Sequence, residues 1–417
     1  MKKTIVLLLT AAVFPLFAAD IYVDYTKGEK NNPGTKNAPL GRFSQAIAKA
    51  KPGDTIYILP NPTPIRDMIR VKNVNGAPGK PITVDAMNNI FIGTEPLNDK
   101  EWKEISPGVF SCKRKMGYNY ASRFYFVNNG KINRMGRFTK SVGGKGWKNP
   151  EKLNPGEWTI TDTCTGPKAS RPRMREFIFT VRLPEGAKTL ADSGIEEVLP
   201  HRGNGIGING ESSWINFRNV IVKNFINDGY NIHHNIRNVR FDNIAAVDCG
   251  DDGISAHETA LIYIKNFVSI GNSTAACHIQ QAECHHENIY AEKTLGKDIS
   301  MHDSVNCTFK NVWINGDAFG GSALYNRKNE NIKCSFENVN IFNRQPGKKA
   351  VFEIKTAGKA EFSFKNTNLA NYVSVTPFEG INVVKDEKEK KAMQEKLAEV
   401  RKEMFALFGG NLEKALK

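Results

Sequence analysis

The chain has 417 residues, of which 40% are hydrophobic, so it is long enough to bury a sizeable core. Its 58 lysines and arginines exceed its 43 aspartates and glutamates, which gives a formal net charge of +15. Such a surface suits an acidic partner, namely a uronate-containing or sulfated glycan or an anionic envelope, and a merely basic exported protein is the alternative. Nucleic acid is the least favoured partner, because the basic residues are spread thinly and accompany no recognisable binding motif.

Residues 1–19 have the three parts of a secretory signal. Lys2 and Lys3 precede an apolar run from Ile5 to Ala18, and small residues follow at the cleavage position. The run is too short to span a membrane, and no other hydrophobic stretch approaches its length. We therefore expect an exported, monomeric protein, periplasmic or extracellular, without a membrane span.

Residues 20–100 predict an N-terminal cap and the first coils of a solenoid. A strand from Ile21 is followed by a short helix with Phe43, Ile47 and Ala50 on one face, and then by a second strand. The segment resembles the N-terminal part of exported right-handed β-helix proteins in the pectate-lyase-like superfamily, in which such a helix plugs the first coil. The resemblance implies the fold and says almost nothing about the reaction.

Residues 101–200 lack any repeat. They contain strand-like pieces around the turn at Asn129-Gly130. These pieces resemble a β-rich insertion found in some β-helix glycosidases. We expect this part to flank the solenoid and to help wall a cleft.

Residues 201–380 repeat with a short period. Seven asparagines recur at intervals of 22 to 28 residues: Asn219, Asn243, Asn266, Asn288, Asn311, Asn338 and Asn366. This period, with strand-like alternation around each asparagine, predicts an all-β fold, a right-handed parallel β-helix. Four residues before three of these asparagines, Cys284, Cys307 and Cys334 are predicted to stack as core thiols; disulfides or a metal site are the alternatives.

Residues 381–417 predict a charged helix. Apolar residues recur at i, i+4, i+7, i+11 and i+14 and make one stripe: Met393, Leu397, Val400, Met404 and Leu407. We expect this helix to cap the open C-terminal end of the β-helix. A helix that binds a partner protein is the alternative.

Histidines are concentrated in the main coils, since all eight lie between His201 and His302. Counted from the anchoring asparagine of each coil, positions +12 and +14 are predicted to point outward from one strand face. Adjacent coils lie roughly 4.8 Å apart, so this face would present a ladder of polar groups to a sugar. The candidate substrate-binding residues on it and its flank are His233, Glu258, His278, Gln280, Asp303, Tyr325 and Arg327.

Three aspartates edge the same face, Asp228 in one coil and Asp251 and Asp252 in the next. Mutual repulsion would raise the pKa of at least one of them and leave a proton donor beside an ionised base. Glycosidic hydrolysis needs that division of labour. Acidic turns that simply lead into strands are the alternative.

Two family resemblances attach to these motifs. The letters NDG at 227–229 and GDDGIS at 250–255 are similar to the carboxylate motifs of the polygalacturonase family. That resemblance implies that Asp228 and one aspartate of the pair activate water, while the other protonates the leaving oxygen. The letters DDGISAHET at 251–259 are similar to the catalytic strand of mannuronan epimerases, which implies that His257 is a base or an acid.

The sequence therefore predicts an exported enzyme that degrades an acidic polysaccharide or oligosaccharide, preferably by glycosidic hydrolysis. A polysaccharide lyase or uronate C5-epimerase and a non-catalytic glycan-binding protein are the alternatives. No cofactor or metal is expected to be required, although the acidic turns offer an optional calcium site. The candidate catalytic residues are Asp228, Asp251, Asp252, His257 and His302.

Overall fold

The computed structural model describes residues 18–133, 147–164, 172–316, 323–326, 331–344, 351–356 and 359–417. Arg327 and residues 1–17 of the predicted signal lie outside the described residues.

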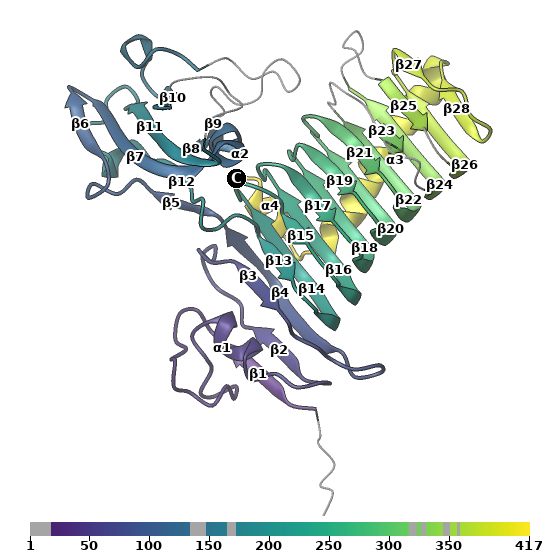
Figure 1. Ribbon diagram of the computed structural model, residues 1–417, viewed down its shortest axis with the longest axis horizontal. Coiled ribbons are helices and arrows are strands. Elements are labelled where there is room, and N and C mark those ends of the chain that lie inside the picture. Colours follow the sequence, from purple (N-terminus) through teal and green to yellow (C-terminus); the bar gives the residue numbers. More distant parts are fainter. Residues whose placement is uncertain are drawn as a thin grey trace, which may run out of the picture.

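Two parallel sheets run the length of a solenoid (Figure 1). The eleven-stranded sheet consists, in spatial order, of β1 (Asp20–Val23), β2 (Thr55–Ile58), β4 (Ile82–Ile92), β14 (Ser213–Lys223), β16 (Arg237–Val247), β18 (Leu261–Ile270), β20 (Glu283–Glu292), β22 (Asn306–Gly316), β24 (Ile332–Asn343), β26 (Ala360–Ala370) and β28 (Ile381–Val384). The nine-stranded sheet consists of β27 (Ser374–Val375), β25 (Val351–Thr356), β23 (Ala323–Asn326), β21 (Lys297–His302), β19 (Thr274–His278), β17 (Asp252–Ala256), β15 (Tyr230–Ile232), β13 (Ile206–Asn209) and β3 (Ile69–Lys72). Successive coils supply successive strands to each sheet, so the predicted all-β parallel solenoid is confirmed.

The repeated asparagines form a ladder at the bend in the long strands. All seven have positive φ, between 51° and 58°. Each side-chain amide donates to the oxygen of the asparagine in the preceding coil, as Asn266 does to Asn243 at 2.8 Å and Asn288 does to Asn266 at 3.0 Å. The first, Asn219, donates to Asp85 at 2.9 Å. Asparagine suits this position because its short side chain tolerates the left-handed conformation and satisfies a neighbouring coil.

The core of the solenoid is made of inward-pointing columns. Phe309, Phe336 and Phe364 stack with ring centroids 5.2 and 4.9 Å apart and nearly parallel planes. Cys284, Cys307 and Cys334 pair in register and are at most 1% exposed. All seven cysteines are free, so the predicted thiol column is confirmed.

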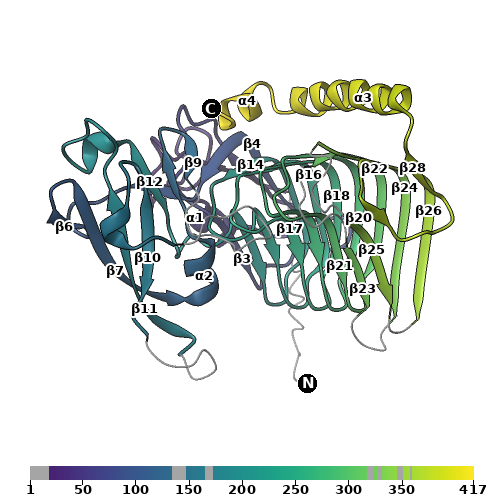
Figure 2. The same cartoon turned by 90° about the horizontal axis from the view of Figure 1, so that it is seen from above.

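The insertion occupies residues 93–205 and leaves the solenoid unbroken, because β13 pairs with β3 and β14 pairs with β4. It contains two antiparallel four-stranded sheets. One has the order β10 (Trp158–Asp162), β11 (Met174–Arg182), β7 (Val109–Gly117) and β6 (Lys103–Ser106), and the other β5 (Thr94–Pro96), β12 (Ile195–Val198), β8 (Phe126–Asn128) and β9 (Lys131–Asn133). The short helix α2 (Tyr118–Arg123) lies between β7 and β8. A separate aromatic core around Trp158 and Phe124 stabilises the insertion, which lies beside the N-terminal half of the solenoid (Figure 2).

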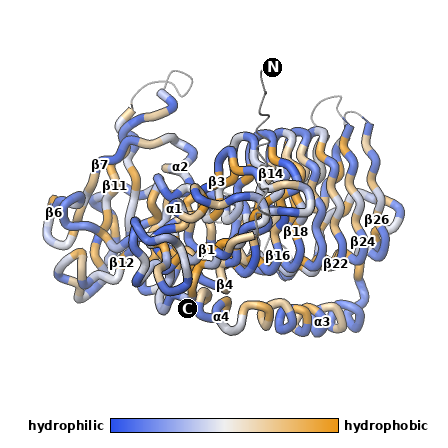
Figure 3. Tube along the Cα trace, turned by 90° about the horizontal axis from the view of Figure 1, so that it is seen from below, coloured by the Kyte–Doolittle hydropathy of each residue, from blue (hydrophilic) through white to orange (hydrophobic). Residues whose placement is uncertain are grey.

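Helices cover the N-terminal end and one long side. The side chain of Phe43 in α1 (Phe43–Ile47) joins the solenoid core. The helix α3 (Glu387–Ala406) contacts β18, β20, β22 and β24, and α4 (Asn411–Ala415) contacts β4 and β14. Hydrophobic and hydrophilic residues alternate along α3 as it runs beside the long strands (Figure 3). Among the described residues, no helix is both long and apolar enough to cross a membrane.

The expected position of α3 at the open C-terminal end is wrong. The second halves of the long strands present apolar residues outward, such as Val268 and Tyr290, and α3 buries these together with Leu397. Leu407, predicted in the stripe, is 39% exposed, and Phe405 is buried instead. The helix therefore covers an apolar side of the sheet that the alternation alone did not reveal.

The asparagine ladder predicts a specific loss of stability. Asn266→Ala removes side-chain bonds to Asn243, Asn288 and Asp242 and places alanine at φ 55°, so we expect the free energy of unfolding to fall by about 3 kcal/mol. Asn266→Gly loses the same bonds without the backbone strain and should cost about 1 kcal/mol less. Urea unfolding followed by circular dichroism measures both, and losses below about 0.5 kcal/mol would show that the ladder does not stabilise the coils.

Candidate active site

The candidate site lies on the outer face of the nine-stranded sheet. Strand register aligns Asn231 with Ser255, Cys277 and Ser300 in successive coils. Asp252 aligns with Thr274 at the start of the same strands. These outward columns place side chains from neighbouring coils side by side, as the repeat predicts.

Asp228, Asp251 and Asp252 form one cluster. One carboxylate oxygen from each can be chosen so that all three lie within 4.8 Å of one another. Asp228 is 2% exposed and Asp252 9% exposed, while 19% of the Asp251 side chain is accessible. The sequence-predicted proximity of the three aspartates is thus what the structure shows, and it creates strong mutual repulsion in a nearly dry site.

Hydrogen-bond donors surround the Asp228 carboxylate. Oδ2 accepts from Nδ2 of Asn231 at 2.5 Å and from the hydroxyl of Ser255 at 2.7 Å, and Oδ1 accepts from the backbone N–H of Asp252 at 3.1 Å. Its own backbone N–H donates to Oδ1 of Asn204 at 3.2 Å. Both carboxylate oxygens of Asp228 therefore accept hydrogen bonds from the protein.

Arg123 links the insertion to the cluster. Its guanidinium, at the end of α2, forms an ion pair with Asp251 and donates to Oδ1 of Asn227. Tyr125, two residues on, donates its hydroxyl to the backbone oxygen of Asp248 at 2.6 Å. The insertion therefore contributes a cation directly to the candidate site.

Two of the three carboxyl groups have pKa values above the ordinary range of an aspartate. Burial and then the charge of Asp228 raise the pKa of Asp251 to about 7, against the opposing effect of Arg123. Burial, followed by the charges of Asp251 and Asp228, raises the pKa of Asp252 well above its ordinary value. Because Arg123 contacts Asp251 and forms no ion pair with Asp252 within the described residues, Asp252 is the better proton donor.

A second chain of hydrogen bonds connects His257 to Asp228. The carboxylate can only accept, so the Ser255 hydroxyl donates to it, and the serine oxygen lies 3.3 Å from Nε2 of His257. Nε2 then carries the proton, and Nδ1 is the nitrogen able to accept one. Burial and the neighbouring His233 lower the pKa of His257 to about 4, so this imidazole is neutral at pH 7.

His233 and Glu258 flank His257. The two imidazole rings stack with centroids 4.0 Å apart, and Nδ1 of His233 lies 3.1 Å from Oε2 of Glu258. Burial alone would raise the pKa of Glu258, but a hydrogen bond from the backbone of His234 and the nearby His233 lower it. Glu258 is therefore charged beside His233.

The predicted outward position of His278 is wrong. The coil between Asn266 and Asn288 is one residue shorter before β19, so Cys277 aligns with Ser255 and His278 aligns with the inward Ala256. His278 is 0% exposed, and its Nε2 lies 2.7 Å from Nε2 of His286 inside the solenoid. His278 therefore does not lie on the face that could contact a sugar.

The missing residue in this coil also changes the position of Gln280. With φ 64° it occupies the left-handed turn that His234, Glu258 and Asp303 occupy in other coils. Its Oε1 accepts from the backbone N–H of Glu258 at 2.6 Å. Gln280 thus supports Glu258 at the edge of the face.

The remaining candidates lie toward the C-terminal coils. His302 is 7% exposed, with Nε2 2.6 Å from the hydroxyl of Ser300, and Asp303 follows it at φ 63°. Tyr325 aligns with His302, although its side chain lies outside the described residues, as does the whole of Arg327. The structure brings together the aspartates with His233 and His257, and it separates His302 from them by two coils.

Arg123 and Asn204 are site residues that the sequence did not reveal. Asn204 lies 24 residues before Asp228, the same period as the coils, and extending the repeat backwards would have found it. Arg123 has no such signal, because its position depends on how the insertion packs against the solenoid.

A cation could bind only at the aspartate cluster, which is the one group of potential metal ligands within the described part of the chain. Carboxylate oxygens are the ligands that calcium prefers. Arg123 also supplies a positive charge there, through its ion pair with Asp251. The cluster thus offers carboxylate oxygens beside an arginine that pairs with one of them.

No family model matches the chain, and no curated protein matches it. Solved structures match most of its length. One described as a glycoside hydrolase has a TM-score of 0.48 at 9% identity, covering 87% of this chain and 89% of its own. The crystal structure of pectate lyase Pel9A has a TM-score of 0.43 at 13% identity (88% and 78% covered), and the complex of XylC with xylose has 0.41 at 11% (89% and 79%). At such identities and TM-scores these likenesses to carbohydrate-active proteins carry no argument about the reaction.

The raised pKa of Asp251 predicts how stability depends on pH. A group whose pKa is higher in the folded state contributes stability that is complete below its unfolded pKa, near 3.9, and is lost as the pH rises through about 7. In Asp251→Asn this loss is absent. We therefore expect the difference in unfolding free energy, Asp251→Asn minus wild type, to increase by at least about 1 kcal/mol from pH 4.5 to pH 8.

Urea unfolding at several pH values measures the difference. Asp99→Asn, which changes an exposed carboxyl in the insertion, is the matched control and should show a constant difference from the wild type. Parallel curves for the wild type and Asp251→Asn would contradict the raised pKa.

Proposed function

We propose that this chain is an exported enzyme that hydrolyses glycosidic bonds of an acidic polysaccharide. One observation carries the proposal: three carboxyl groups from adjacent coils lie within 4.8 Å on an outward sheet face, in different environments. Hydrolysis of a glycosidic bond needs a carboxylic acid and a carboxylate on either side of the bond. The cluster brings three carboxyl groups together, and two of them have raised pKa values.

The contacts assign roles to the three aspartates. Asp252 has a raised pKa and no ion-pair partner within the described residues, so it is the proton donor to the leaving oxygen. Asp228, held by Asn231 and Ser255, is the carboxylate that stabilises developing positive charge or activates water. Asp251 forms an ion pair with Arg123. Its negative charge raises the pKa of Asp252 and so keeps the proton on Asp252.

Proton abstraction from a uronate is the second candidate, and the His257–Ser255–Asp228 chain favours it. A neutral imidazole with a free proton-accepting nitrogen is a suitable base for removing the proton at C5. β-Elimination would then give an unsaturated sugar, and re-protonation would give the epimer. A non-catalytic glycan-binding protein would use the same face without either reaction.

Substitution of the proton donor tests the preferred reaction. Asp252→Asn should lower kcat for release of reducing ends by at least about 100-fold, because a general acid typically contributes that much, and Asp99→Asn should leave it unchanged. The assay uses a panel of uronate-containing and sulfated polysaccharides, reading reducing ends together with absorbance of the unsaturated product. Full activity in a folded Asp252→Asn protein would refute the assigned role.

The variant His257→Gln distinguishes glycosidic hydrolysis from proton abstraction at C5. Glutamine can still donate to Ser255 and cannot act as a base, so hydrolysis by the aspartates should fall by no more than about tenfold. Loss of an unsaturated product, or of deuterium exchange at C5 measured by NMR, by 100-fold or more would instead show that His257 removes a proton. Glycan binding without any product from the panel would indicate the non-catalytic alternative.

A further inference from the structure

A cleft of about 620 Å³ opens at the N-terminal end of the candidate face. Its floor is the outer side of β3 and β13, and its walls include Tyr120 of α2 and His201 of the insertion. Its lining within the described part of the chain includes Arg70 and Lys72 and contains no aspartate or glutamate. This cationic lining contrasts with the acidic cluster two to three coils away.

Alternation along β3 sends Arg70 and Lys72 into the cleft, because Ile69 and Val71, which alternate with them, belong to the solenoid core. Arg70 donates to the backbone oxygen of His201 at 2.7 Å, which holds the guanidinium at the cleft wall. Within the described residues, no carboxylate lies within ion-pair distance of Arg70 or Lys72.

Nearby arginines differ from these two cations. Arg66 pairs with Glu196 at 2.6 Å and Arg202 pairs with Glu95 at 2.7 Å, so their charges are already compensated. Burial and the positive charges of Arg202 and Arg70 lower the pKa of His201, which is therefore neutral at pH 7. The uncompensated positive charge of this wall thus belongs to Arg70 and Lys72.

Gly207 leaves space above the floor of the cleft because it has no side chain. It stands between Arg70 and Asn231 in the outward column, and a Cβ there would meet only side-chain nitrogens at 3.8 and 3.9 Å. Its φ is not in the left-handed region, so other residues fit its backbone. A larger side chain at this position would enter the cleft without disturbing the protein.

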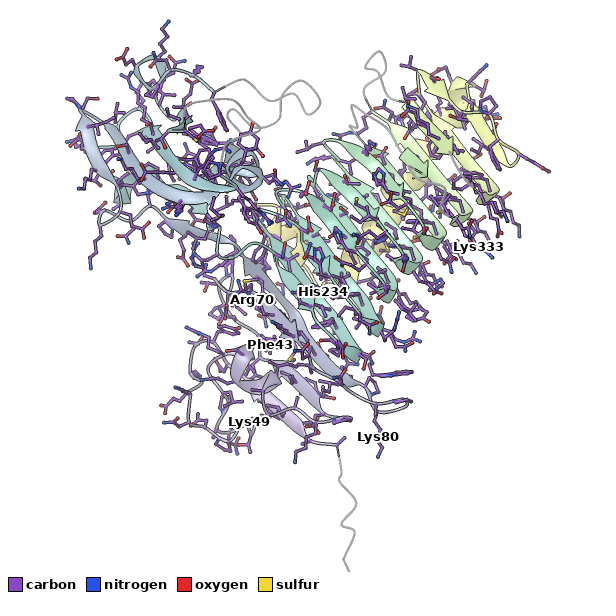
Figure 4. The ribbon with its side chains drawn as sticks, viewed as in Figure 1. Phe43, Lys49, Arg70, Lys80, His234 and Lys333 are labelled. Carbon is purple, nitrogen blue, oxygen red and sulfur yellow. The ribbon has the colours of Figure 1, made fainter. Side chains whose placement is uncertain are left out.

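The cleft and the acidic cluster share neighbouring residues. Asn204 lines it and also accepts from the backbone of Asp228, and α2 contributes both Tyr120 to the cleft and Arg123 to Asp251. Figure 4 shows Arg70 and His234 close together on this face, with Lys80 well away from both. By the coil spacing, Arg70 lies roughly 10 to 15 Å along the solenoid from the aspartates, the distance of a neighbouring sugar or the one beyond.

We propose that Arg70 and Lys72 form an anion subsite that binds a carboxylate or sulfate group of a sugar on the N-terminal side of the bond to be cleaved. The inference deepens the proposed function: the glycan runs along the solenoid, with an anionic unit over β3 and β13 and the reacting bond over β15 and β17. Binding at this subsite does not depend on which reaction follows. Because the cations lie at the N-terminal end of the face and the aspartates lie two to three coils away, an anionic glycan would bind in one orientation along the solenoid.

Calorimetry on the full chain tests the subsite, with Asp252→Asn as the background so that the probe is not consumed. The probes are an oligogalacturonate, a sulfated carrageenan oligosaccharide and a neutral cello-oligosaccharide. We expect at least one anionic probe to bind more tightly than the neutral one, and to lose about tenfold in affinity in Arg70→Gln and again in Lys72→Gln. Preference for the first or second probe identifies the anionic group as carboxylate or sulfate.

Two further variants keep the test independent of folding and of general charge. Lys80→Gln, an exposed cation away from the cleft, should bind as the background protein does. Gly207→Leu should weaken binding of every probe by at least about tenfold while leaving the melting temperature unchanged.

The outcomes distinguish this inference from the proposed hydrolysis. Equal binding of anionic and neutral probes, no binding of either anionic probe, or equal losses in Lys80→Gln and Arg70→Gln would overturn the subsite. Retained hydrolysis by Asp252→Asn, with the predicted losses in the Arg70 and Lys72 variants, would overturn only the assignment of the acid.

Discussion

The asparagine ladder is the constraint on which the rest of the structure depends. Each amide donates to one neighbouring coil and accepts from the other while its backbone takes the left-handed conformation at the bend. Side chains in successive coils are thereby locked in register along both sheets. Inward columns of phenylalanine and cysteine and the outward columns of the candidate site follow from that register, so the ladder positions the side chains of the candidate site as well as stabilising the fold.

A single slip in this register shapes the site. The shorter coil before β19 turns His278 inward, where it meets His286, and turns Cys277 outward. The outward face beyond the third aspartate is consequently less polar, and His302 is separated from His257 by an apolar step at Ile279. The clustered carboxyl groups and the stacked imidazoles of His233 and His257 therefore lie in the coils of Asp228 and Asp252.

The insertion makes the face electrostatically asymmetric. Its helix α2 brings Arg123 to Asp251 and Tyr120 to the cleft above β13. Partial neutralisation by an arginine, together with protonation of the crowded carboxyl groups, allows three aspartates to coexist in a nearly dry cluster. The face therefore carries positive charge at its N-terminal end and a cluster of carboxyl groups two to three coils further along.

The sequence alone determined the period, the parallel solenoid, the thiol column and the proximity of the three aspartates, because contacts one coil apart recur at a regular spacing. His278 was misplaced because counting from an asparagine does not show where within a coil a residue is missing. Only the tertiary structure decided that Arg123 reaches Asp251, that Arg70 lies two coils from Asp228, and that α3 covers a side of the sheet. These contacts join segments separated by the insertion or by the whole solenoid, and they depend on the free energy of packing entire surfaces together, which no local periodicity encodes.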